Sequence, residues 1–160
     1  MALTINLRHL ERHDLHLRGE LLIEDLDLAG IDELIQLPTP LQYDLRIERP
    51  GNDILVRGSL FVALDCQCVR CLKPIKNSIR LDPWMCDIPL VGEDQVHVDN
   101  DCVDLTPFVR EDILLAFPQH PLCDKECVGL PQASQFGQPI KPSESGPGSS
   151  AWAELNKLKF

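Results

Sequence analysis

Hydrophobic and polar residues alternate along several stretches of the chain, as they do in strands that bury one face. The longest alternation runs over residues 54–64. Its apolar face carries Ile54, Val56, Leu60, Val62 and Leu64, and its polar side carries Arg57, Ser59 and, just beyond, Asp65. Residues 42–48 also alternate, and Pro50 and Gly51 lie in a turn-forming sequence between the two stretches. This pattern predicts an antiparallel hairpin.

Other segments predict further strands. Residues 3–7 and 15–23 have an alternating pattern, and residues 96–98 form a short apolar–polar–apolar stretch. Residues 75–81 alternate directly after a cysteine-rich turn. We therefore expect that turn to lie at the tip of a second hairpin.

Residues 104–117 have the spacing of an amphipathic helix. Asp104 or Thr106 can cap its beginning. Pro107 suits the first turn, and Pro118 ends the helix. The apolar stripe consists of Leu105, Val109, Ile113 and Ala116, widened by Phe108 and Phe117. We expect this stripe, including its aromatic residues, to pack in the core.

The composition changes after residue 130. Residues 131–150 are rich in Pro, Gly, Ser and Gln, which is typical of a flexible linker. In residues 151–160, apolar side chains including Trp152 fall on one helical face, so we expect a short amphipathic helix that docks on the domain or on a partner. The fold class is predicted to be α+β. Residues 1–130 would form a single domain with an N-terminal β region, in which antiparallel hairpins pack against one helix.

Composition and charge narrow the classes of function. The chain has 160 residues and a formal net charge of −10, which disfavours a protein that coats nucleic acid and excludes DNA from the expected partners. Apolar runs such as residues 113–117 are far too short to cross a bilayer, so no membrane role is expected. Charged residues from Arg8 onward interrupt any signal-like apolar segment. We therefore expect a cytoplasmic protein.

Two close pairs of cysteines carry the clearest chemical signal. Cys68 and Cys71 form a C-x2-C turn, and Cys123 and Cys127 form a C-x3-C pair. Both spacings allow two thiolates to converge on one tetrahedral ion, and four thiolates leave zinc no open position for water. We therefore predict a structural zinc knuckle. The cations of Arg70 and Lys73 would offset part of its negative charge.

Other interpretations of these thiols stay open. The four cysteines can be free and buried, as isolated cysteines commonly are. Cys66, Cys68 and Cys71 can instead form a thiol-based redox or metal-handling centre. Cys66 and His120 are substitute ligands, whereas Cys86 and Cys102 are isolated and are predicted to be packing residues.

No pattern in the sequence predicts a catalytic centre. A Gly-rich phosphate loop, a G-x-S-x-G turn and an H-E-x-x-H helix are all missing from it. The chain does offer one compact basic patch, which consists of Arg70, Lys73, Lys76 and Arg80. This patch can contact RNA or a partner protein, or it can be a solvated strand face. We expect no enzyme.

The combination of these motifs resembles the YceD/DUF177 family. The resemblance is carried by C-V-R-C-L-K-P at residues 68–74, by E-D-I-L-L-A-F-P at residues 111–118, and by P-L-C-D-K-E-C-V-G-L at residues 121–130. The segment at residues 151–160 is similar to the C-terminal box of the family. Pro131 and Ser134 stand where many relatives have a further C-x2-C pair, so a ligand role there is absent.

The resemblance implies a role in the accumulation of large-subunit (23S) ribosomal RNA, that is, in ribosome biogenesis and rRNA processing. The family is not known as an enzyme. The implied partners are a ribosomal protein, an rRNA-processing factor or precursor 23S rRNA. The cysteines carried over from the family pattern are Cys68, Cys71, Cys123 and Cys127.

Overall fold

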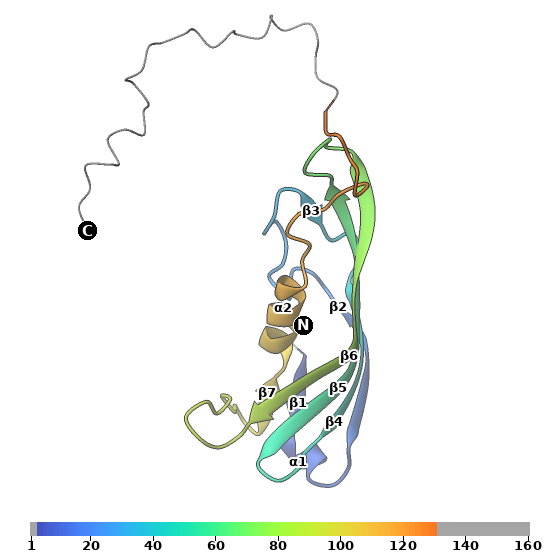
Figure 1. Ribbon diagram of the computed structural model, residues 1–160. Helices are drawn as coiled ribbons and strands as arrows, with labels where there is room; N and C mark the ends of the chain where they lie inside the picture. The colour runs from blue at the N-terminus through green and yellow to red at the C-terminus, as the bar shows by residue number, and fades with distance from the viewer. Residues whose placement is uncertain (1–2, 131–160) are drawn as a thin grey trace, which may run out of the picture. The chain divides into compact units, whose positions relative to one another are not determined.

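The computed structural model describes residues 3–130 (Figure 1). Its elements in chain order are β1 (Thr4–Asn6), α1 (Leu7–Leu10), β2 (Leu15–Leu21), β3 (Ile35–Gln36), β4 (Leu41–Glu48), β5 (Asp53–Gln67), β6 (Pro74–Pro89), β7 (Cys102–Asp104) and α2 (Thr106–Leu115). The predicted class, antiparallel β with one packed helix, is confirmed. The linker predicted for residues 131–150 and the helix predicted for residues 151–160 lie outside the described residues.

Strand β5 is the centre of a curved antiparallel sheet (Figure 1). β6 pairs with it along its whole length, while β4 and β3 share the opposite edge. The predicted apolar face of β5 is buried, with Ile54 and Leu60 fully inaccessible to solvent. β2 extends the sheet beyond β4. Both predicted hairpins are therefore present, and the alternation in the sequence assigns the core face correctly.

Strand β6 is longer than the predicted segment of residues 75–81 and continues to Pro89. The ladder with β5 shifts register between Gly58 and Leu60, so Asp82 and Pro83 lie together opposite a single residue of β5. A bulge of this kind accommodates a proline, which has no N–H to donate to the ladder. β6 therefore continues through Pro83, although proline usually ends a strand.

Helix α2 packs on one face of the sheet (Figure 1). Val109 and Ile113 are fully buried there, and Phe108 and Phe117 pack partly buried against the same core, as predicted. The helix is shorter than residues 104–117. The Asp104 carboxylate accepts a hydrogen bond from the Thr106 N–H at 2.9 Å, while the Thr106 hydroxyl accepts one from the Leu3 N–H at 2.8 Å. This second bond ties the start of the helix to Leu3, the residue just before β1.

Two N-terminal and loop predictions need correction. The strand expected at residues 3–7 ends at Asn6, whose side chain caps the short helix α1 by accepting from the Arg8 N–H. Residues 96–98 do not form a strand. They lie in a loop, and no strand pairs with them residue by residue. The strand in this region is β7, which pairs with β1. Within residues 3–130, no helix is long and apolar enough to cross a membrane.

Candidate metal centre

The turn that carries Cys68 and Cys71 connects β5 to β6, at the far end of the long hairpin. The Cys68 N–H donates to the Lys73 carbonyl at 2.9 Å, and the Leu72 N–H donates to the Cys68 carbonyl at 2.8 Å. Leu72 has a φ of 59°, a conformation unusual for a residue that is not glycine. These contacts fold the turn tightly, as the C-x2-C spacing predicts.

The second cysteine pair lies in the loop that follows α2, and not on the helix itself. Two hydrogen bonds fasten this loop to the first turn: the Val69 N–H donates to the Pro121 carbonyl at 3.0 Å, and the Arg70 guanidinium donates to the Cys127 carbonyl at 2.9 Å. Asp124 shapes the loop between the two thiols, since its carboxylate accepts from the Glu126 N–H at 2.8 Å.

The structure brings all four predicted thiols together. The Sγ atoms of Cys68, Cys71, Cys123 and Cys127 all lie within 4.8 Å of one another. The Cys71–Cys123 distance is 3.5 Å and the Cys68–Cys127 distance is 3.9 Å. These distances exceed a disulfide bond of about 2.05 Å. They match the edge of about 3.8 Å that four sulfurs form around zinc at a Zn–S length of about 2.3 Å.

The environment of the cluster favours negative charge on one sulfur. Cys68 is buried, and its pKa is lowered to about 6, chiefly by a hydrogen bond from the backbone N–H of Cys123. Burial acts in the opposite direction and raises this pKa, but the backbone N–H groups of Cys71 and Arg70 lower it further. Hydrogen bonds to Cys71 and Cys127 raise the pKa of the exposed Cys123 thiol to about 12. A bound divalent cation would take the place of the protons that these thiols otherwise share.

The remaining cysteines take no part in the cluster. Cys66 points into the core with 2% of its surface exposed, and burial, followed by the Asp65 carboxylate, raises its pKa. Burial and Asp112 raise the pKa of Cys86 to about 11. Neither has the exposed, electropositive surroundings of a reactive thiol. His120, the other substitute ligand, is also outside the group.

The four predicted contact cations lie in two places. Arg70 and Lys73 flank the cysteine turn, where Arg70 also holds the second loop. Lys76 and Arg80 are exposed on β6, and their register partners on β5 are Asp65 and Phe61. The role of these residues in contacting RNA or a partner stays a prediction.

The sequence analysis did not single out Arg46 and Arg57, which lie on the sheet surface that faces away from α2, as candidate contact residues. Strand pairing sets Arg46 of β4 directly opposite Arg57 of β5. The signal for this pair was present in the alternation of both strands around the turn at residues 50–53. Counting outward from that turn would have placed the two arginines on one face.

Fold and cluster together define a small antiparallel β protein whose hairpin tip and post-helix loop share a four-cysteine cluster suited to a metal ion. The chain belongs to the family described as "Large ribosomal RNA subunit accumulation protein YceD", which it matches over residues 56–159. The described part of this range runs from β5 to the second cysteine pair. The family takes its description from the accumulation of large-subunit rRNA.

Curated relatives are uncharacterized proteins of mycobacteria. One from Mycobacterium leprae is 28% identical over 105 residues, which cover 61% of this chain and 48% of that protein. One from Mycobacterium tuberculosis is 29% identical over 129 residues, which cover 76% of this chain and 59% of that protein. The matched part thus spans about half to three fifths of the length of these relatives. No solved structure matches the chain.

Proposed function

We propose that this chain is a non-enzymatic ribosome-biogenesis factor that supports the accumulation and processing of 23S rRNA. It would act in the cytoplasm by contacting a ribosomal protein, an rRNA-processing factor or the precursor RNA itself. The observation that carries this proposal is the family match over residues 56–159. The match includes the long hairpin and α2, so it covers much of the described fold.

The metal in this proposal is zinc, and its role is to hold the structure. The donor set is four sulfurs with no oxygen or imidazole, and their spacing suits a closed tetrahedral site. Cys68, Cys71, Cys123 and Cys127 would hold the ion and so connect the tip of the β5–β6 hairpin to the loop after α2. Arg70 and Lys73 would then present positive charge beside a centre that is itself fixed in place.

The thiol-redox or metal-handling alternative has less support from the geometry. It needs Cys66 to act with Cys68 and Cys71, but Cys66 is in the core. Metal content and a thiol titration separate the two functions. One zinc per chain with four slowly reacting thiols supports the structural role, and a zinc-free protein with one fast thiol supports the redox role.

The proposed function is tested by isolating the affinity-tagged full chain from the cells that encode it. We expect large-subunit ribosomal proteins and precursor 23S rRNA in the eluate, with one equivalent of zinc per chain. An unrelated tagged protein of similar size and negative charge is the control. If ribosomal components are no more abundant in the sample than in the control, the proposal is wrong.

A further inference from the structure

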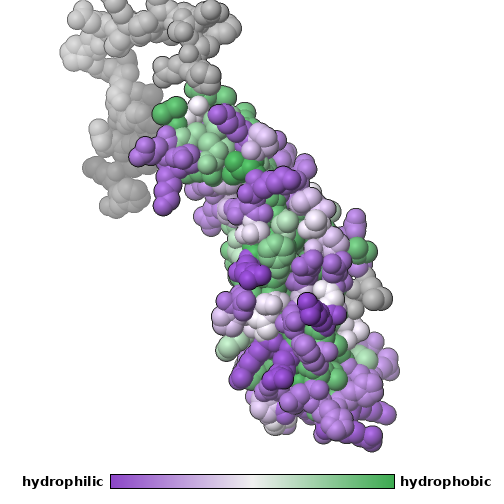
Figure 2. Space-filling model, turned by 90° about the vertical axis from the view of Figure 1, so that its right-hand side faces the viewer, coloured by the Kyte–Doolittle hydropathy of each residue, from purple (hydrophilic) through white to green (hydrophobic). Residues whose placement is uncertain are grey.

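One face of the sheet is covered by no other described element, and its side chains come from β2, β4, β5 and β6. Figure 2 shows this face, with hydrophilic side chains over much of its lower half. Strand register orders them in rows. One row contains His16, Arg46, Arg57 and Met85, and the next but one contains Glu20, Gln42, Phe61 and Arg80. Arg18, Asp44 and Ser59 lie between the two rows.

Three arginines of this face form no salt bridge with any described residue, whereas His16 and Arg18 share Asp44. Asp44 is bound by His16 at 2.6 Å and lies 3.8 Å from Arg18. Among the described residues, Arg46, Arg57 and Arg80 have no carboxylate within 4.0 Å, whereas Arg8, Arg49 and Arg110 all have one. This distribution is unexpected in a chain with 25 acidic and 15 basic residues. Acidic partners are abundant, yet these three arginines lack one.

Among the arginines without a salt bridge, Arg46 and Arg57 also lie next to each other. They are register partners on adjacent strands, and both are exposed. Like charges directly opposite one another destabilise a sheet. The fold therefore keeps a positive pair at a cost in stability, and an anionic ligand would offset that cost.

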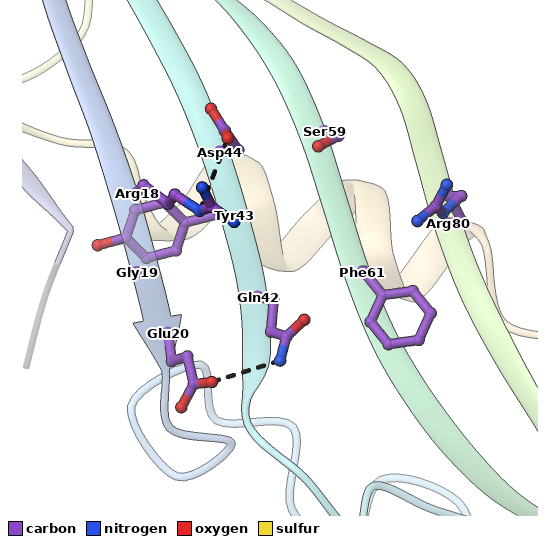
Figure 3. Close-up of a pocket in the computed structure, with 9 residues that line it drawn as sticks. All are labelled: Arg18, Gly19, Glu20, Gln42, Tyr43, Asp44, Ser59, Phe61 and Arg80. Carbon is purple, nitrogen blue, oxygen red and sulfur yellow. Dashed lines mark hydrogen bonds and ion pairs between the residues drawn. The ribbon is translucent and has the colours of Figure 1, made fainter.

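An aromatic ring lies beside the cations on the same face. The Arg80 guanidinium sits over the Phe61 ring at 5.9 Å from its centre. These two residues and Arg18 border a hollow of about 470 Å³, to which Gln42 and Ser59 add uncharged polar groups (Figure 3). A second hollow of about 350 Å³ is lined by Arg46 and Arg57 together with the acids Glu48 and Asp44, and it shares Asp44 with the first. The two hollows are thus neighbours on one surface.

We propose that this outer sheet face, with Arg46, Arg57, Arg80 and Phe61 at its centre, binds a short single-stranded segment of RNA. Arginine forks match phosphate oxygens, and the partly exposed ring of Phe61 supplies a stacking surface for a base. An acidic peptide would use the cations but would gain nothing comparable from Phe61 and its stacked guanidinium. This inference rests on the proposed function, which supplies RNA as the partner.

The direct test measures binding of a labelled single-stranded RNA of about 12 nucleotides to the full chain at about 50 and 200 mM salt. We expect Arg46→Gln/Arg57→Gln to weaken binding at least tenfold and to reduce the salt dependence by about 1.4 in log–log slope, about 0.7 for each lost phosphate contact. Phe61→Leu should weaken binding roughly tenfold with the salt slope unchanged, because stacking releases no counterions.

A matched control separates this face from net charge. Arg8→Gln/Arg12→Gln removes the same charge from the region of α1, away from the sheet face, and should leave binding within about twofold. Arg46→Gln/Arg57→Gln should fold at least as stably as the parent chain, because it removes a like-charge pair. Equal weakening by both double variants, no RNA binding by the parent chain, or tighter binding of a poly-aspartate peptide would each overturn the proposal.

The same variant separates this inference from the proposed function. If Arg46→Gln/Arg57→Gln still co-purifies with precursor 23S rRNA as the parent does, the proposed function stands and this face is not the RNA contact. If the parent chain itself fails to co-purify with ribosomal components, the proposed function falls, whatever the result with the oligonucleotide.

Discussion

The Sγ atoms of Cys71 and Cys123 lie 3.5 Å apart, although 52 residues separate them in the chain. The intervening segment contains β6, β7 and α2. A metal ion held by both thiols would therefore close a long loop and fix the end of the hairpin against the segment that follows the helix. Hydrogen bonds alone, such as the one from Arg70 to the Cys127 carbonyl, leave that junction exposed to water.

Replacing Cys71 or Cys123 with serine is expected to abolish stoichiometric zinc binding and to lower the free energy of unfolding. The physical reason is that the binding free energy of a structural zinc is part of the folding free energy. Elemental analysis and urea unfolding measure the two effects. Cys102→Ser is the control, since its hydroxyl can still accept the hydrogen bond from Asn6. A metal-free Cys71→Ser/Cys123→Ser protein as stable as the parent would contradict the structural role.

Removing the metal with a chelator should loosen one end of the domain and leave the other intact. The hairpin tip and residues 118–130 have few buried apolar side chains, whereas the strands around Leu45 and Ile54 are fully buried. Local stability follows such burial. Hydrogen exchange should therefore rise near Cys68 and Cys127 and stay slow in β4 and in the first half of β5. Uniform loss of protection would show that the cluster supports the whole sheet.

Trp84→Phe tests the contact between β6 and α2. The Trp84 indole N–H donates to the Asp112 carboxylate at 2.6 Å, and Trp84 is 4% exposed. Losing a hydrogen bond to a charged group costs about 1.5–3 kcal/mol. Asp112→Asn keeps an acceptor and should cost less. The free energies of unfolding measure both, and a loss below about 0.5 kcal/mol for Trp84→Phe would show that this bond adds little.

Gly58→Ala should destabilise the sheet strongly, because an added Cβ would lie 2.0 Å from the Asp44 carbonyl oxygen in the neighbouring strand. Backbone atoms of a paired strand cannot move aside cheaply, so we expect a loss of roughly 3 kcal/mol or more. Gly19→Ala is the comparison, since its Cβ would meet the Tyr43 hydroxyl, which a side-chain rotation can displace. Thermal unfolding should rank Gly58→Ala well below Gly19→Ala, and the reverse order would contradict the register.

The sequence predicts the parts of this fold that depend on local pattern. The alternation over residues 54–64 assigns the buried face of β5, and the two cysteine spacings identify the four thiols that meet. It does not predict the extension of β6 through Pro83, because only pairing with β5 reveals the bulge that accommodates a proline there. The pairing of β1 with β7 depends on contacts across the whole chain, which no local pattern encodes.

The outer sheet face shows a second limit of prediction from sequence. Arg46 and Arg57 each read as the polar position of an alternating strand, which is ordinary for a solvated surface. What distinguishes them is that they lie opposite each other in the register and that, among the described residues, neither forms a salt bridge, although Asp44 and Glu48 line the same hollow. The total charge gives no hint of such a surface, since a net charge of −10 disfavours RNA binding.

The most direct test of the central claim is the ratio of mature 23S rRNA to small-subunit rRNA in cells depleted of this protein. We predict that the ratio falls, that 23S precursors accumulate, and that the wild-type chain restores both while Cys71→Ser/Cys123→Ser does not. An unchanged ratio after complete depletion would contradict a role in large-subunit rRNA accumulation.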